Sequence, residues 1–188
     1  PRDHSVRAAM CAGVGGSTRA SALIGAISVG AGNLGGAREV YTAAQYWSQC
    51  GTDIDAWRKM IKDPPVEERA DVWLPMEHPP GFDPNGASCP APVKQTLAHL
   101  ADVSDSECLS WLRQNREALE DIAGMPLAMS GVATAAMCDL EFTPEQAEIL
   151  YLLLRLPGAA VHSLEQELNW RKYPFFGDSL RFSNASET

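Results

Sequence analysis

The chain has 188 residues, of which 45% are hydrophobic, and a formal net charge of −9. This composition is that of a globular protein with a buried core, arranged as one domain or two small ones. The acidic balance argues against nucleic acid and against an anionic membrane as partners. Every apolar run is interrupted by a charge or a breaker before 18 residues, so the sequence predicts no membrane span.

The five cysteines are scattered, with no C-x-x-C pair and no Cys/His cluster. We therefore expect free thiols in a reducing compartment and no metal site. The polar N-terminus lacks the apolar core of a signal peptide, which favours a cytoplasmic location. The chain begins with Pro1, which indicates a fragment or a processed chain.

The first third of the chain carries three helix signals and hardly any strand signal. A run of small apolar residues over 17–31 is typical of a tightly packed internal helix, and a second helix is predicted over 38–50. Thr52 with Asp55 resembles the N-terminal cap of a short helix that ends before Pro64.

The longest irregular stretch is the proline-rich segment 71–91, and loops of this length in compact proteins are usually functional or linkers. After it, Ser104 and Glu107 match a capping box for a helix over 107–122.

A second capping box, formed by Thr143 and Gln146, predicts a helix over 144–156. Pro157 and Gly158 are expected to bend or break that helix. The helix signals together predict an all-α protein.

Five segments carry a resemblance to a known family. They are PRDHS (1–5), GNLGGAREV (32–40), PGFDPNGASCPA (80–91), MPLAMSGVATAAM (125–137) and LRLPGAAVHSLEQELNWRKYP (154–174). In this order they resemble the motifs of citrate synthases and citryl-CoA lyases, and they span nearly the whole chain.

The resemblance implies a citrate synthase-like multihelical fold, with the chain matching the C-terminal two-thirds of such a protein. Residues 1–37 and 126–188 would form a discontinuous large domain that makes a homodimer, and residues 38–125 a small domain. In the family, closure of the small domain completes the active site and excludes water.

The family's reaction needs a base for the thioester methyl group, a donor to the enolate oxygen and a donor to the ketone. By resemblance, Leu34 and Asp83 occupy the places of the two donor histidines, and Ser130 that of the basic aspartate. None of these side chains suits the usual role, so we expect no citrate synthesis by the usual mechanism. Ser130 as a nucleophile would need a nearby base, and none is visible locally.

Part of the ligand-holding set survives. His4, Arg155 and Arg171 match carboxylate-binding positions, and arginine suits carboxylates because its planar fork pairs with them bidentately. The backbone of the family's loops meets coenzyme A, and the matching residues here are Gly35, Gly36, Gly81 and Phe82.

His78 and Asp83 are the only nearby candidates for rebuilt acid–base groups. His78 is alternatively a solvated loop histidine, Asp83 the cap of a turn, and the pair Gly35–Gly36 a plain turn.

Two functions follow from the resemblance. The first is a divergent citrate synthase- or citryl-CoA lyase-like enzyme that acts on an acyl-CoA and an oxaloacetate- or citryl-type carboxylate by a non-standard mechanism, with no covalent cofactor. The second is a non-catalytic paralogue that binds these ligands or stabilises an active partner subunit. A generic helical domain with a coincidental resemblance is a third possibility.

Overall fold

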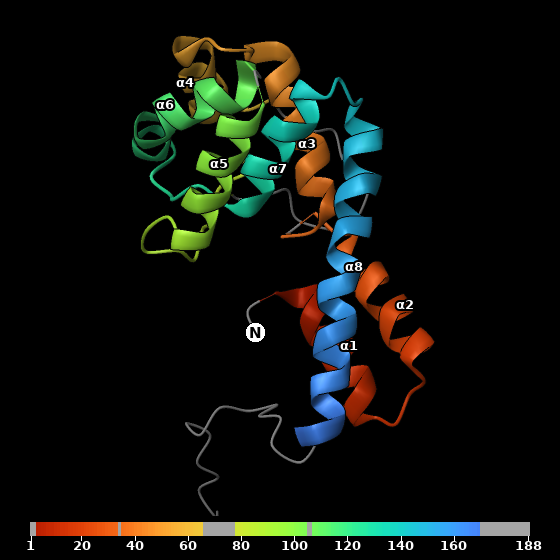
Figure 1. The fold of residues 1–188 in the computed structure, drawn as a ribbon. Helices are drawn as coiled ribbons and strands as arrows, with labels where there is room; N and C mark the ends of the chain where they lie inside the picture. The colour runs from red at the N-terminus through yellow and green to blue at the C-terminus, as the bar shows by residue number, and fades with distance from the viewer. Residues whose placement is uncertain (1–2, 34, 66–77, 105–106, 170–188) are drawn as a thin grey trace, which may run out of the picture. The chain divides into compact units, whose positions relative to one another are not determined.

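The computed structural model describes residues 3–33, 35–65, 78–104 and 107–169 of the chain. Throughout these ranges the protein is all-helical, which confirms the predicted class, and the only extended pairing there is an isolated bridge between Phe82 and Leu127. The helices are α1 (His4–Val14), α2 (Arg19–Gly30), α3 (Ala37–Cys50), α4 (Ile54–Lys62), α5 (Ala91–Val103), α6 (Glu107–Ala123), α7 (Met129–Asp139) and α8 (Pro144–Asn169) (Figure 1).

One of the three predicted helix caps is wrong. The start of α4 is capped by Asp53, whose Oδ1 accepts the backbone N–H groups of Asp55 and Ala56, because its carboxylate stands at the residue before the helix. The start of α6 is capped from a distant helix, since the carboxylate of Asp139 accepts the N–H of Cys108 at 2.7 Å. Ser104 donates to the carbonyl of Leu100 at the end of α5. Residues 105–106, which lead from Ser104 into α6, lie outside the described residues, so the predicted Ser104 cap stays a prediction.

The third cap is confirmed, and the break that should follow it is absent. The N–H of Thr143 donates to the side chain of Gln146, and the N–H of Gln146 donates to Thr143 Oγ1. The helix then runs for 26 residues with Pro157 in its interior. The proline removes one hydrogen bond at about 3 kcal/mol, and the strong helix formers on both sides of it outweigh this loss.

The chain divides into two compact units. The first consists of Pro1–Ser28 and Leu156–Thr188, and the second of Val29–Arg155. Both this division and the predicted one contain a discontinuous unit, but the boundaries differ. In the structure, α7 and the first half of α8 belong to the second unit together with α3 to α6. The predicted domains 1–37, 38–125 and 126–188 stay a prediction.

The second unit has a large apolar core. Trp47, Trp57 and Trp111 meet there edge-on or stacked, with ring centroids 5.0 to 6.3 Å apart. Leu97 and Leu119 are almost completely buried against them. Aromatic rings bury the largest apolar area of any side chains, so this cluster dominates the packing of the unit.

The core of the first unit is small. Its buried cluster consists of Ala9, Ala26 and Ala159, with Leu23 packed against it. The hydroxyl of Ser5 is also buried and donates to the carbonyl of Ala26 at 2.8 Å. Alanine lets helices approach closely but buries little area, so this cluster of described residues contributes little hydrophobic stabilisation.

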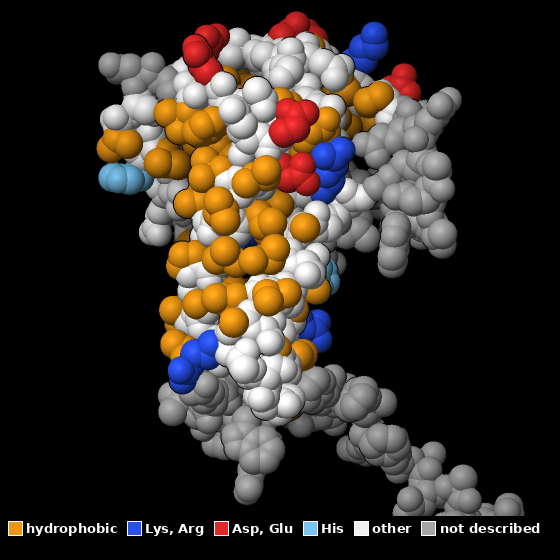
Figure 2. All heavy atoms as spheres, turned by 90° about the vertical axis from the view of Figure 1, so that its right-hand side faces the viewer, with side chains coloured by type: hydrophobic (Ala, Val, Ile, Leu, Met, Phe, Trp, Pro, Cys, Tyr) orange, Lys and Arg blue, Asp and Glu red, His pale blue; other side chains and the backbone are white. Residues whose placement is uncertain are grey.

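Helix α8 exposes apolar side chains along its length, and Figure 2 shows hydrophobic side chains gathered on the face where α8 and α2 lie. The exposed ones are Ile149, Leu153, Leu154, Val161 and Leu164. By length and composition, Pro144–Glu165 could cross a membrane, with a mean hydropathy of 1.2 and 17% of the window buried. A single helix of this kind is weak support for a span, and the predicted absence of a membrane partner stays a prediction.

Candidate functional site

Residues from three of the family-like segments meet around one buried carboxylate in the second unit, that of Glu39 in the first turn of α3. The loop 78–83 and the first turn of α7 supply the groups that face it, and only 3% of Glu39 is exposed. The N-terminus of a helix stabilises negative charge, which suits a carboxylate at this place.

Glu39 divides its two oxygens between different partners. Its Oε1 accepts the backbone N–H of Gly81 at 2.9 Å and the hydroxyl of Ser130 at 2.8 Å. Its Oε2 lies 3.8 Å from Nε2 of His78, whose side chain is 8% exposed. Hydrogen bonds to a buried carboxylate are charge-assisted and stronger than neutral ones, so the cluster ties α3, the loop and α7 together.

The backbone of the loop lies directly against the backbone of α7. A Cβ added at Gly131 would lie 2.6 Å from the carbonyl oxygen of Gly81, so only glycine fits there. The Gly81 carbonyl accepts the N–H of Ala128 at 2.9 Å. This close approach explains how Ser130, one residue before Gly131, comes within reach of the carboxylate that also holds Gly81.

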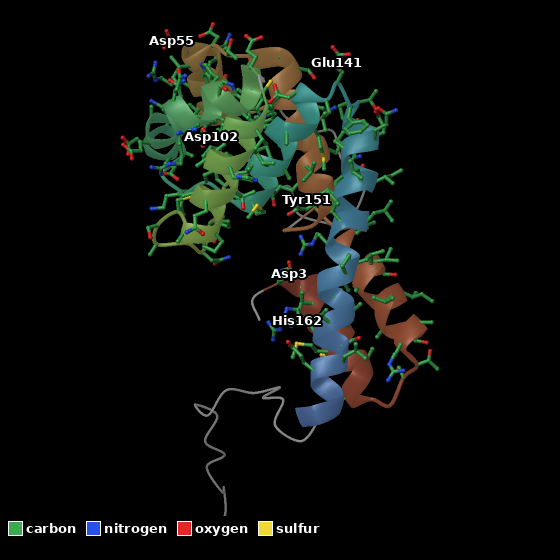
Figure 3. The ribbon with its side chains drawn as sticks, in the orientation of Figure 1. Asp3, Asp55, Asp102, Glu141, Tyr151 and His162 are labelled. Atoms are coloured by element: carbon green, nitrogen blue, oxygen red, sulfur yellow. The ribbon has the colours of Figure 1, made fainter. Side chains whose placement is uncertain are left out.

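Tyr151 and Arg155, one turn apart on α8, lie at the same end of α3. Figure 3 shows Tyr151 on the side of α8 that faces α3. Burial raises the pKa of the Tyr151 phenol to about 12, and the negative charge of Glu39 adds to the shift. At neutral pH this phenol is protonated and can donate a hydrogen bond.

Arg155 is half-buried, and burial lowers its pKa. Its Nη1 donates to the carbonyl of Gly35 at 3.3 Å, and its guanidinium carbon lies 5.4 Å from the ring centre of Tyr151. Arginine stays charged at any ordinary pH. A guanidinium therefore stands beside the glycine turn that precedes α3.

The structure thus brings together five predicted site residues: Gly35 with Arg155, and His78, Gly81 and Ser130 through Glu39. The base that Ser130 lacked locally comes from a residue 91 positions away. In this arrangement the serine hydroxyl donates to a carboxylate.

Asp83 lies in a turn. Its Oδ1 accepts the N–H of Asn85 at 2.9 Å, and its own N–H donates to the carbonyl of Pro126. These contacts match the alternative interpretation of this residue as a turn cap.

The residues expected to bind coenzyme A differ in whether a ligand can reach them. The N–H of Gly81 is used by Glu39, and Phe82 is buried in the apolar core. A Cβ at Gly36 would lie 2.2 Å from the carbonyl oxygen of Gly32, so the backbone is tightly folded there. Gly35 is exposed beside Arg155 and is the member of this group that a ligand can reach.

Three further residues were predicted for the site. His4 is an exposed residue at the start of α1 in the first unit. Leu34 and Arg171 lie outside the described residues. No group of three or more metal-binding side chains occurs within the described ranges.

Glu39 itself was missed by sequence reasoning, although the sequence carries a signal for it. Residues 39, 43, 46 and 50 fall on one face of α3, and all four are buried. A glutamate that continues an apolar stripe of a helix is a candidate for a buried charge with partners.

Compared with known proteins, the chain matches no protein-family model and no curated protein. The resemblance to citrate synthases therefore rests on the five sequence segments alone and stays a prediction.

Proposed function

We propose that the protein is a divergent citrate synthase- or citryl-CoA lyase-like enzyme that acts on an acyl-CoA and an oxaloacetate- or citryl-type carboxylate by a non-standard mechanism. One observation carries the proposal. Residues of four family-like segments, far apart in the chain, meet at the N-terminal end of α3 through Glu39–Gly81, Glu39–Ser130 and Arg155–Gly35 contacts.

In this proposal Arg155 binds a carboxylate of the second ligand. The guanidinium is half-buried, and partial desolvation strengthens its attraction for an anion. The exposed Gly35 turn offers backbone to the same ligand or to coenzyme A. Arg171 and His4 are further candidates for this role by resemblance alone.

His78 is the proposed base. It is the one predicted acid–base residue with a carboxylate beside it, and such a carboxylate stabilises the imidazolium that forms when a base takes up a proton. Asp83 is the alternative base. Replacing His78 by Gln and Asp83 by Asn distinguishes them, since only the variant of the true base loses turnover.

The homodimer is also part of the proposal. The exposed apolar side chains of the first unit, Ile24, Val161 and Leu164, are 62%, 55% and 44% exposed, and burial against a second copy would remove them from water.

The first test is calorimetric titration of the intact protein with acetyl-CoA, coenzyme A and oxaloacetate, separately and in sequence. Binding of both ligands, each improving the other, is expected. Arg155→Gln should weaken oxaloacetate binding roughly tenfold or more, because a charge-assisted pair is lost. Arg113→Gln is the matched control, since Arg113 pairs with Asp102 at an exposed site on α6. Binding of neither ligand would overturn the proposal.

A second candidate function is a non-catalytic subunit that binds the same ligands. The observation in its favour is that the Ser130 hydroxyl and the Gly81 N–H are both used by Glu39. A catalyst releases free coenzyme A or forms a thioester from suitable substrates, and a thiol-detecting assay measures this directly. Ligand binding without any such conversion would favour the non-catalytic function.

A further inference from the structure

The unequal use of the two oxygens of Glu39 has a chemical consequence for His78. Oε1 already accepts two hydrogen bonds, from Gly81 and Ser130. Oε2 faces Nε2 of the His78 imidazole, at 3.8 Å. Both side chains are more than nine-tenths buried, so little water competes for this oxygen.

A neutral imidazole carries its proton on one of its two nitrogens, and the group facing each nitrogen decides which. A carboxylate attracts the N–H and repels a lone pair. With Glu39 at Nε2, the form protonated on Nε2 is stabilised and the lone pair is left on Nδ1.

We propose that Glu39 is the positioning residue of this site, and that it holds the proton of His78 on Nε2 so that Nδ1 is the nitrogen that accepts a proton. This inference rests on the proposed function where it concerns catalysis. In that reaction the C–H bond beside the thioester carbonyl breaks, its electron pair passes to the carbonyl oxygen, and the proton forms an N–H bond at Nδ1. The resulting imidazolium faces the negative charge of Glu39.

The chain contains a second histidine–glutamate pair with the opposite geometry, which serves as an internal reference. In the first unit, Nδ1 of His162 lies 2.7 Å from Glu165 Oε2, one turn along α8 (Figure 3). That pair is exposed, with 42% and 57% of the two side chains accessible. The same carboxylate chemistry there favours the form protonated on Nδ1.

The test is nitrogen NMR of the four histidines in the full-length protein at a pH where they are neutral. In the wild type, the Nε2–H form of His78 should be in excess by roughly tenfold or more, because a charge about 4 Å away between two buried side chains is weakly screened. His162 should lean the other way. A wild-type His78 protonated on Nδ1 would overturn the proposal without any variant.

Two variants separate positioning from a structural role. Glu39→Gln keeps an acceptor for Gly81 and Ser130 but removes the charge, so the preference of His78 should collapse while His162 is unchanged. Ser130→Ala removes a hydrogen bond but keeps the charge, so the preference should survive. An unchanged His78 signal in a folded Glu39→Gln protein would contradict the proposal. Because no substrate is added, a failure here is distinct from a failure to bind or convert acyl-CoA.

Discussion

The two units of the chain are stabilised in different ways. The second has a core of tryptophan and leucine side chains and a buried polar cluster around Glu39. Among its described residues, the first has a buried cluster of alanines and places larger apolar side chains, such as Ile24 and Val161, at its surface. The second unit therefore contains the contacts needed for its own stability, and the first gains from a surface that covers it.

The largest expected effect concerns the exposed apolar side chains of the first unit. Replacing both Val161 and Leu164 with Glu should convert the proposed homodimer into a monomer, since burying two carboxylates in an apolar contact is strongly unfavourable. Light scattering after gel filtration measures the mass directly.

Leu140→Glu is the control for that variant, because Leu140 is an exposed leucine of the second unit at 68% accessibility. It should leave the dimer intact. A wild-type protein that is monomeric at high concentration would contradict the proposed dimer, and co-sedimentation of that monomer with lipid vesicles would point to a membrane as the cover.

The next effect tests the polar cluster of the second unit. Glu39→Ala leaves the Ser130 hydroxyl and the Gly81 N–H buried without their acceptor and should lower the free energy of unfolding by about 2 to 5 kcal/mol. Asp102→Ala, which removes an exposed ion pair with Arg113, should lower it by less than about 1 kcal/mol. Urea denaturation measures both. Equal effects would mean that the cluster adds nothing beyond a surface pair.

A smaller effect compares close packing in the two units. Gly131→Ala places a methyl group 2.6 Å from a backbone oxygen and should cost about 1 to 3 kcal/mol. Gly25→Ala, within α2, meets no described atom within 4 Å and should stabilise by up to about 1 kcal/mol. Opposite shifts in melting temperature are expected. A Gly25→Ala protein with a lower melting temperature would show that another surface packs against α2 at Gly25 in solution.

The parts of the fold that sequence reasoning predicted correctly depend on neighbouring residues. The capping box of Thr143 and Gln146 joins groups three residues apart, and its two hydrogen bonds are present as predicted. At the start of α6 the N–H groups of Cys108 and Leu109 donate to Asp139, some 30 residues away, and no local pattern indicates this acceptor. Short-range rules cannot weigh an acceptor that arrives through tertiary packing.

The candidate site shows the same difference between features that neighbouring residues determine and contacts that only tertiary packing creates. The types of residue at His78, Ser130 and Arg155 were visible in the sequence, but the group that joins the first two is Glu39, which lies 39 and 91 positions from them. Its partner Gly81 is 42 positions away. A search for buried charges on apolar helix stripes would have selected Glu39, although it could not have identified these partners.

The smallest effect on stability at neutral pH concerns two thiols of the second unit, Cys108 and Cys138. Burial, with the charge of Asp139 as the next cause, raises the pKa of Cys108 to about 12 and that of Cys138 to about 11, from 9.0 in a free thiol. The thiolate is the reactive form, so both should alkylate roughly 100-fold or more slowly in the native protein than in urea at the same pH. Mass spectrometry after iodoacetamide treatment measures each site.

Because both pKa values are raised on folding, the folded state holds these protons more tightly. The stability they contribute is complete below about pH 9 and is lost as the pH rises toward 11 and 12. Rapid labelling of the native protein at pH 8 would mean that the start of α6 and the end of α7, where Cys108 and Cys138 lie, open locally far more often than the rest of the unit.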